Sequence, residues 1–163
     1  MKYEANATQI LETHLKVVQV LDGDSLIVAS IFGKNEKEIR LYGLDAPENK
    51  HNRKLREMEK KCSLAGEFLI QLGRMSTDFI LTHAAPGTSI TIITEKSNPK
   101  DFYGRQLAYV ILPSGECLNE VLIREGYARA ESEYLCSKLP LYQQLNFQAR
   151  VSGRGLYAFT NRF

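Results

Sequence analysis

The order of strand-like and helix-like segments is the feature that most constrains the fold of this chain. Short β-branched runs and turn signals predict three strands, then a long helix with an apolar stripe, then two strands and two helices. The predicted strands span residues 12–20, 25–30, 37–44, 89–94 and 107–112, and the predicted helices span 64–80, 118–125 and 139–151. The Asp22-Gly23 pair is typical of a hairpin, in which glycine adopts positive φ easily, so the first three strands are expected to form an antiparallel meander.

This order matches a five-stranded OB-fold barrel with a helix between strands 3 and 4 and C-terminal helices, an α+β fold that is mainly β. The chain has 163 residues, of which 44% are hydrophobic and 25% charged, values that suit one globular domain with a buried core. We therefore expect a single domain over residues 12–159, a flexible lead-in over 1–11 and a tail over 160–163. Such barrels commonly bind nucleic acids or sugar polymers, but the fold alone names no function.

Local patterns place particular side chains. Asn119 lies where a helix N-cap is expected, and Gly126 lies where the same helix is expected to end. Alternation along the third strand puts Arg40, Tyr42 and Leu44 on one face, where the guanidinium needs an anionic partner. The side chains expected in the core are Phe68, Leu69, Leu72, Phe79, Tyr109 and Phe147.

Charge is distributed unevenly along the chain. The net charge is only +2, but residues 49–61 contain six Lys or Arg against two Glu. This basic segment either attracts a polyanion or is an ordinary solvated loop or helix start. The odd number of cysteines (Cys62, Cys117 and Cys136) argues against a full disulfide framework and leaves one pair open, and their spacing indicates no zinc site.

The sequence shows no segment with the length and apolarity of a membrane span, so no membrane partner is expected. The first residues lack the apolar region of a signal peptide. The protein is then either intracellular, or secreted or periplasmic after removal of a signal. We expect a monomer.

Three short islands contain residues that can do chemistry. They are Asp22-Gly23-Asp24, the segment from Arg40 to Asp45-Ala46-Pro47-Glu48, and Asp101-Phe102-Tyr103-Gly104-Arg105. Taken singly, they have structural interpretations as a hairpin turn, a salt bridge followed by a turn, and a polar turn before a strand. Together they supply oxygen ligands for a hard cation, a carboxylate to handle water, and guanidinium groups for a phosphate. Metal-assisted cleavage of a phosphodiester needs this combination.

The proline shapes the second island. Pro47 has a fixed φ and disfavours helical conformation at Ala46, so a sharp turn is expected after Asp45. That turn can bring the Asp45 side chain, the Ala46 carbonyl and the Glu48 side chain to a common point.

In order and spacing the islands resemble the staphylococcal nuclease-like family, also called thermonucleases. The resemblance covers roughly residues 14–158 and rests on Asp22-Gly-Asp24-Ser25, Arg40-Leu…Asp45-Ala-Pro-Glu48, Asp101-x-Tyr103-Gly104-Arg105-x-Leu107-Ala108-Tyr109, and Leu118-Asn119-Glu120-x-Leu122-Ile123-x-x-Gly126-x-Ala128. It implies a calcium-dependent nuclease that hydrolyses DNA or RNA and leaves 3′-phosphate ends.

The resemblance also implies a metal site and a base. Asp24 and Asp45 would bind a calcium ion, with the backbone carbonyl of Ala46 as a further ligand. Glu48 would act as general base, or would orient the attacking water.

The remaining roles concern the substrate. The resemblance implies that Arg40 and Arg105 hold the scissile phosphate and that Tyr103 contacts the nucleotide. Tyr134 is the candidate for a further tyrosine that stacks on the nucleotide. The family often has a lysine where this chain has Phe102, a difference that bears on affinity and end preference.

Two other functions are open from the sequence. An OB-fold module that binds nucleic acid without catalysis would require structural roles for the charged residues. A sugar-binding barrel would predict more exposed aromatic side chains, and the chain has no Trp.

Overall fold

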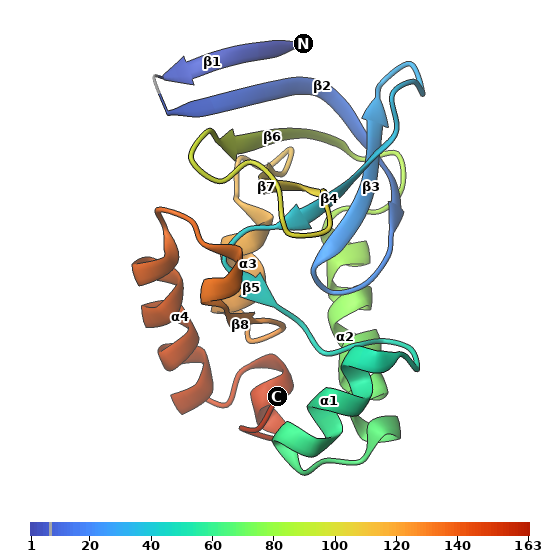
Figure 1. Cartoon of the computed structure of the whole chain (residues 1–163), viewed down its shortest axis with the longest axis vertical. Helices are drawn as coiled ribbons and strands as arrows, with labels where there is room; N and C mark the ends of the chain where they lie inside the picture. Colours follow the sequence, from blue (N-terminus) through green and yellow to red (C-terminus); the bar gives the residue numbers. More distant parts are fainter. Residues whose placement is uncertain (7) are drawn as a thin grey trace.

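The structure is a computed structural model that describes residues 1–6 and 8–163, except for the side chains of residues 3–6. Its strands are β1 (Lys2–Asn6), β2 (Gln9–Val20), β3 (Ser25–Ser30), β4 (Lys37–Leu41), β5 (Leu44–Asp45), β6 (Ser89–Glu95), β7 (Gln106–Ile111) and β8 (Arg129–Ala130). Its helices are α1 (Arg53–Cys62), α2 (Gly66–His83), α3 (Leu118–Arg124) and α4 (Leu139–Val151), with short 3-10 helices η1 (Ser132–Tyr134) and η2 (Gly155–Ala158). Figure 1 shows the long strands at the end of the molecule that holds the N-terminus, and α1 with the C-terminus at the opposite end.

Five strands close into a barrel. The sheet order is β1-β2-β3-β4-β7-β6, and β2 also pairs with β6, which closes the barrel. β2 bends to reach both neighbours because its ladder with β6 is irregular between Glu12 and Leu15, where His14 has a φ of 59°. The helices α1 and α2 lie between β5 and β6 in the chain, before the last two barrel strands. The predicted OB-fold barrel, with helix between its third and fourth strands, is therefore confirmed.

Both ends of the chain contact the rest of the fold. Within the predicted lead-in over residues 1–11, Lys2–Asn6 form β1, which pairs antiparallel with β2, and β2 begins at Gln9; residue 7 lies outside the described residues. β1 satisfies backbone groups at an edge of β2 that would otherwise lack partners. The predicted tail also packs on the protein, because Phe163 is buried and its ring lies against Tyr157 with centroids 4.6 Å apart.

The third predicted strand is shorter than expected. β4 ends at Leu41, and Gly43 follows with a φ of 73°, a conformation that favours glycine. A Cβ at Gly43 would also lie 2.7 Å from a tyrosine ring of α4. The predicted alternation that placed Arg40, Tyr42 and Leu44 on one face is therefore wrong beyond the end of β4. The chain instead forms β5, which pairs with β8.

The predicted third helix is present as α3, but Asn119 does not cap it. The Asn119 side chain is fully buried, accepts a hydrogen bond from the Val110 backbone N–H at 3.0 Å, and donates to the carbonyls of Tyr42 and Ala108 at 3.2 and 3.1 Å. It therefore joins α3 to the barrel, a contact that no local pattern indicates. Gly126 follows α3 with a φ of 81°, as expected for a residue that ends a helix.

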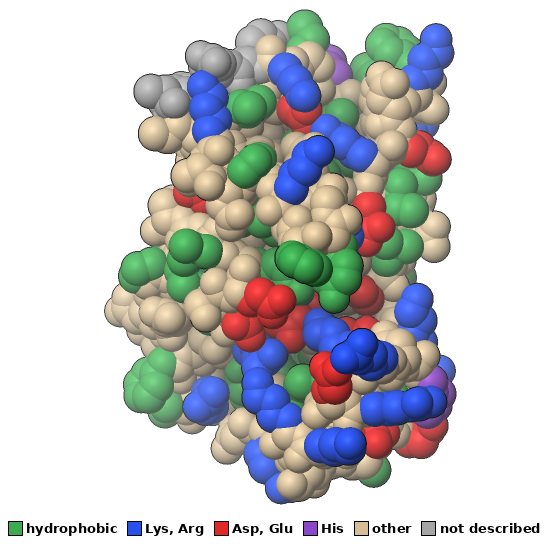
Figure 2. Space-filling model, viewed as in Figure 1, with side chains coloured by type: hydrophobic (Ala, Val, Ile, Leu, Met, Phe, Trp, Pro, Cys, Tyr) green, Lys and Arg blue, Asp and Glu red, His purple; other side chains and the backbone are tan. Residues whose placement is uncertain are grey.

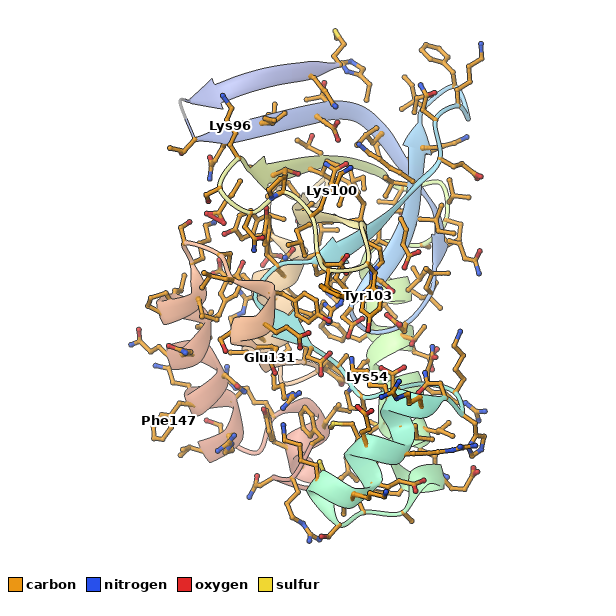
Figure 3. The ribbon with its side chains drawn as sticks, in the orientation of Figure 1. Lys54, Lys96, Lys100, Tyr103, Glu131 and Phe147 are labelled. Carbon is orange, nitrogen blue, oxygen red and sulfur yellow. The ribbon has the colours of Figure 1, made fainter. Side chains whose placement is uncertain are left out.

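Two hydrophobic clusters stabilise the fold. One fills the barrel and continues beneath α3 and α4, and the other joins α1, α2 and the C-terminal segment. Among the predicted core side chains, Leu69, Leu72 and Tyr109 are buried, and Phe68 and Phe79 are partly buried. The prediction for Phe147 is wrong: it projects from the outer side of α4 with 66% of its surface exposed (Figure 3), because Asn146 and Ala149 occupy the inward face.

The three cysteines are free thiols, so the disulfide pair left open by the sequence does not form in this structure. Within the described residues, no helix has both the length and the apolarity that crossing a bilayer requires.

Candidate active site

A cleft of about 520 Å³ lies where the barrel, α1 and η1 meet. Its lining comes from the β2–β3 turn, β4, the segment before α1, α1, the β6–β7 turn and η1: Asp22, Asp24, Arg40, Glu48, Asn52, Arg53, Lys54, Glu57, Tyr103, Arg105, Glu133 and Tyr134. Figure 3 shows Tyr103 on the barrel side of this region and Lys54 on the α1 side. The cleft thus unites six of the eight predicted site residues, and Asp45 and Ala46 do not line it.

The β2–β3 hairpin positions Asp24. The Asp22 carboxylate accepts hydrogen bonds from the Asp24 backbone N–H at 3.1 Å and from the Ser25 hydroxyl at 2.7 Å. Gly23 is required for close packing and not for the positive φ expected of it, since a Cβ there would lie 2.6 Å from the Cβ atoms of Ala46 and of a serine in α2. The same close approach lets the Ala46 N–H donate to Asp24 Oδ2 at 3.0 Å.

Arg40 links two islands. Only 1% of its surface is exposed. Its Nη2 lies 3.2 Å from Asp24 Oδ2 and 2.9 Å from Asp45 Oδ1, and its Nη1 donates to backbone carbonyls at the ends of β4 and β5. The salt bridge considered as a structural interpretation is therefore present, and it holds together the two carboxylates predicted to bind a metal.

The surroundings shift the pKa values of these two carboxylates in opposite directions. Burial raises the pKa of Asp24 well above its usual value; Arg40 opposes this shift, and neighbouring carboxylates add to it. Burial also disfavours the ionised form of Asp45, but the charges of Lys54, Arg40 and Arg129 outweigh it and hold the Asp45 pKa below its usual range. Asp24 is therefore the carboxylate that an additional positive charge would stabilise most.

Sequence reasoning missed two cations at the site. Lys54 Nζ lies 2.7 Å from Asp45 Oδ1 and 3.1 Å from Glu48 Oε1, and Arg129 Nη2 lies 2.9 Å from Asp45 Oδ2. Lys54 belongs to the basic segment 49–61, and its charge was the available signal. Arg129 had no local signal, because the pairing of β5 with β8 brings it opposite Asp45 from far along the chain.

Glu48 is fixed at the cleft wall. Its Oε2 accepts a hydrogen bond from Asn52 Nδ2 at 2.6 Å, and its Oε1 is the atom that Lys54 contacts. The backbone of this segment rests directly on α2, where a Cβ at Gly73 would lie 2.3 Å from the Glu48 carbonyl oxygen. Both the main chain and the carboxylate are thereby held, as is required of a group that must orient a water molecule.

The third island is a turn organised by its first residue. The Asp101 carboxylate accepts hydrogen bonds from the backbone N–H groups of Tyr103 and Arg105 at 3.0 and 2.8 Å, and from Arg105 Nε at 2.7 Å. Arg105 Nη1 also lies 3.3 Å from Glu38 Oε1. The turn leaves Phe102 and Tyr103 97% and 78% exposed. Asp101 therefore orients Arg105 and presents two aromatic rings to solvent.

The two tyrosines predicted to contact a nucleotide lie in different environments. Tyr103 is exposed, whereas Tyr134 is only 7% exposed and its ring centroid lies 3.7 Å from the guanidinium carbon of Arg40. The ring of Tyr134 thus forms a cation–π contact with Arg40, and Tyr134 also lines the cleft.

Among the described residues, no group of three or more His, Cys, Asp or Glu side chains is arranged to hold a metal ion. Asp24 and Asp45 nevertheless approach one common atom, Arg40 Nη2. Their carboxylates are oxygen donors, which hard cations prefer. The buried Asp24 lies among other carboxylates, and a cation would stabilise its ionised form. The donor chemistry therefore fits a hard cation, although protein cations already pair with Asp45.

Known proteins are similar to this chain over most of its length. Residues 38–158 match the family model described as Staphylococcal nuclease homologue. The chain is 34% identical over 137 residues to the endonuclease YhcR of Bacillus subtilis (strain 168), across 83% of this chain and 10% of that protein. It is 31% identical over 147 residues to an uncharacterized endonuclease of Escherichia coli O157:H7, across 90% and 78% of the two chains. It is 36% identical over 121 residues to a thermonuclease of Staphylococcus hyicus, across 74% of this chain and 60% of that one.

Proposed function

The chain belongs to the staphylococcal nuclease homologue family, and from this premise we propose that it is a nuclease that hydrolyses phosphodiester bonds of DNA, RNA or both by metal-assisted attack of water. The observation that carries the proposal is the single cleft lined by Asp24, Arg40, Glu48 and Arg105. This set supplies an oxygen ligand, a carboxylate for water and two guanidinium groups. The names endonuclease and thermonuclease borne by similar proteins support the same activity.

Arg40 and Arg105 are proposed to stabilise the charge of the phosphate. Arg105 is 24% exposed, and its Nη2 has no hydrogen-bond partner in the described part of the chain, so it can donate to a phosphate oxygen without losing an existing bond. Arg40 is buried and paired, so it contributes mainly fixed positive charge at the cleft wall. Charge that is held in place before the reaction stabilises the transition state without reorganisation.

Glu48 is proposed as the base. Its carboxylate would accept a proton from the attacking water, or would hold that water in line with the phosphorus. Asn52 and Lys54 each contact one of its oxygens and so fix the orientation of the carboxylate.

We propose calcium as the cation, with Asp24, Asp45 and the backbone carbonyl of Ala46 as its protein ligands. When bound, the ion would supply Lewis-acid stabilisation of the phosphoryl charge. Ligation by carboxylate, carbonyl and water oxygens in flexible geometry suits calcium better than magnesium, which prefers strict octahedral geometry. The family resemblance further implies that the 5′ oxygen leaves and that 3′-phosphate ends result.

Chelation of calcium is expected to stop cleavage, and added calcium is expected to restore it, because the ion would supply the Lewis-acid stabilisation of the phosphoryl charge. The measurement is plasmid nicking, together with digestion of single-stranded DNA, double-stranded DNA and RNA, with calcium, with excess chelator and after calcium is added back. An OB-fold module without catalysis would bind these substrates and leave them intact. Digestion that continues unchanged in excess chelator would refute the role of the metal.

Replacement of Tyr103 by Ala is expected to weaken substrate binding by about 1–3 kcal/mol, the usual contribution of one aromatic ring stacked on a base. The loss should raise KM more than it lowers kcat, because the ring is 78% exposed and its contact with Arg105 is long, with the guanidinium carbon 5.7 Å from the ring centroid. Phe147→Ala is the matched control, since it removes an exposed aromatic ring on the outer side of α4. Equal KM values for the two variants would rule out contact between Tyr103 and the nucleotide.

The nuclease unit is proposed to span residues 12–159 and to act as a monomer, because side chains of one chain complete the cleft. Light scattering of the protein with and without a bound oligonucleotide tests this.

A further inference from the structure

Helix α1 presents a basic face to solvent. Its inward side buries Leu55, Met58 and Cys62 in the hydrophobic cluster that joins α1, α2 and the C-terminal segment. Arg53, Arg56 and Lys60 recur at three- and four-residue spacing on the outward side, and all three are exposed. Figure 2 shows side chains of Lys and Arg gathered over this end of the molecule. The basic segment noted in the sequence is therefore an ordered row of charges on a helix.

The row continues the cleft. Arg53 lines the cleft from the first turn of α1, and Arg56 and Lys60 extend the same face away from it. Over seven residues a helix rises by about 10 Å. One strand of a duplex presents about three phosphates in that length. A strand lying in the cleft can therefore meet further positive charge as it leaves along α1.

Most of this charge is available to a ligand. Arg53 pairs with Glu57 at 3.1 Å, but this pair is exposed and therefore weak. Arg56 and Lys60 form no ion pair with any residue that the structure describes. By contrast, Lys54 is occupied by Asp45 and Glu48. The outward row is thus positioned to bind an anion from outside the protein.

The side of the cleft formed by η1 has the opposite charge. Glu133 lines the cleft there. Glu131 is close to it in the chain (Figure 3) and forms an ion pair with Arg129 at 3.2 Å. Like charges repel a phosphodiester backbone, and basic residues attract it. The two sides of the cleft are therefore unequal, and a bound polyanion is favoured on the α1 side.

We propose that the basic face of α1, formed by Arg53, Arg56 and Lys60, binds the phosphodiester backbone of the nucleic acid strand where it extends beyond the cleft. This inference rests on the proposed nuclease function, because a strand can continue along α1 only if a nucleic acid occupies the cleft. The face lengthens the binding site and makes affinity depend on substrate length and on salt.

The test compares binding of labelled single-stranded DNA oligonucleotides at the two ends of the range of about 4 to 16 nucleotides that one OB fold covers. Affinity is measured by fluorescence anisotropy at several salt concentrations, in chelator to prevent cleavage. The test variant is Arg56→Ala/Lys60→Ala, which changes neither the cleft nor the buried face of α1. The matched control, Lys34→Ala/Arg150→Ala, removes two exposed basic side chains from other parts of the protein.

For the long oligonucleotide, the slope of log affinity against log salt should become shallower by about 1.4 in the test variant, since each lost contact to a single strand contributes about 0.7. The short oligonucleotide should bind with unchanged slope, and the control variant should match the wild type with both lengths. Arg56→Lys/Lys60→Arg should retain the wild-type slope. Circular dichroism and thermal unfolding of each variant establish that α1 is intact.

A slope that is unchanged in Arg56→Ala/Lys60→Ala would overturn the inference while leaving the proposed function standing. The same holds for equal losses with the short and long oligonucleotides. If this variant binds anionic lipid vesicles more weakly than the wild type does while the oligonucleotide slope stays constant, the face binds a membrane surface and the inference fails. If the wild-type protein binds neither oligonucleotide in chelator and Glu48→Gln binds neither with calcium, the proposed function fails together with the inference.

Discussion

The Glu48→Gln variant is expected to lose activity by about 10²- to 10⁴-fold while it binds nucleic acid and calcium as before. That range is the usual contribution of a positioned general base. The amide has the shape of the carboxylate and can still accept the hydrogen bond from Asn52, but it cannot accept a proton from water. The measurement is the rate of plasmid nicking at saturating calcium, with oligonucleotide affinity measured in parallel.

Glu57→Gln provides the matched control for this experiment. Glu57 also lines the cleft, but its side chain is 64% exposed and, among the residues that the structure describes, forms an ion pair only with Arg53. The same chemical change at this position should therefore leave the cleavage rate close to that of the wild type. Full activity of Glu48→Gln would eliminate Glu48 as the base, and equal losses in the two variants would indicate a general effect of charge in the cleft.

Replacement of Arg40 by Met is expected to abolish cleavage and to lower the free energy of unfolding by about 3–5 kcal/mol, the usual cost of removing one partner from a buried ion pair. The large loss follows from burial: side-chain exposures are 1% for Arg40, 6% for Asp24 and 4% for Asp45. Without the guanidinium, Asp24 would have no ion-pair partner within the described residues and only the more distant charge of Lys54, whereas Asp45 would keep Lys54 and Arg129. Urea denaturation without calcium measures the effect.

Arg105→Met separates the loss of stability from the loss of activity. Arg105 is 24% exposed, its partner Glu38 is 40% exposed, and Asp101 keeps two backbone donors when the guanidinium is removed. We therefore expect Arg105→Met to lose activity by a factor on the order of 10²–10³, as for the loss of one donor that stabilises the transition state. The loss of stability should be smaller than for Arg40→Met, because the Asp101 side chain, although only 4% exposed, keeps its two backbone donors. If Arg40→Met were as stable as Arg105→Met, Arg40 would not be what stabilises the buried carboxylates.

Much of the architecture could be predicted because it is encoded locally. The β-branched runs and the apolar stripe of α2 gave the order of barrel strands and helix, and α4 spans the predicted residues 139–151. Local periodicity fails where a long-range contact decides the outcome. Gly43 ends β4 because an aromatic ring of α4 packs against it, and Asn119 is drawn into the barrel instead of capping α3.

The same distinction between local patterns and long-range contacts applies to the candidate site. The three islands contain seven of the predicted site residues, of which five line the cleft, and Tyr134 lines it as well. The partners of those residues could not be predicted. Arg129 reaches Asp45 through the pairing of β5 with β8, and the ring of Tyr134, the candidate to stack on a nucleotide, lies against Arg40. The sequence therefore indicated the chemistry of the site but not how its charges are compensated.

The sequence by itself determined the barrel order, the family and the set of charged groups, because each depends on residue types at short spacing. Only the tertiary structure decided that Arg40 is buried between Asp24 and Asp45, that Lys54 and Arg129 complete the network, and that the basic segment forms one face of α1 beside the cleft. The physical reason is that charge compensation depends on distance and burial. Both are set when strands and helices far apart in the chain pack together.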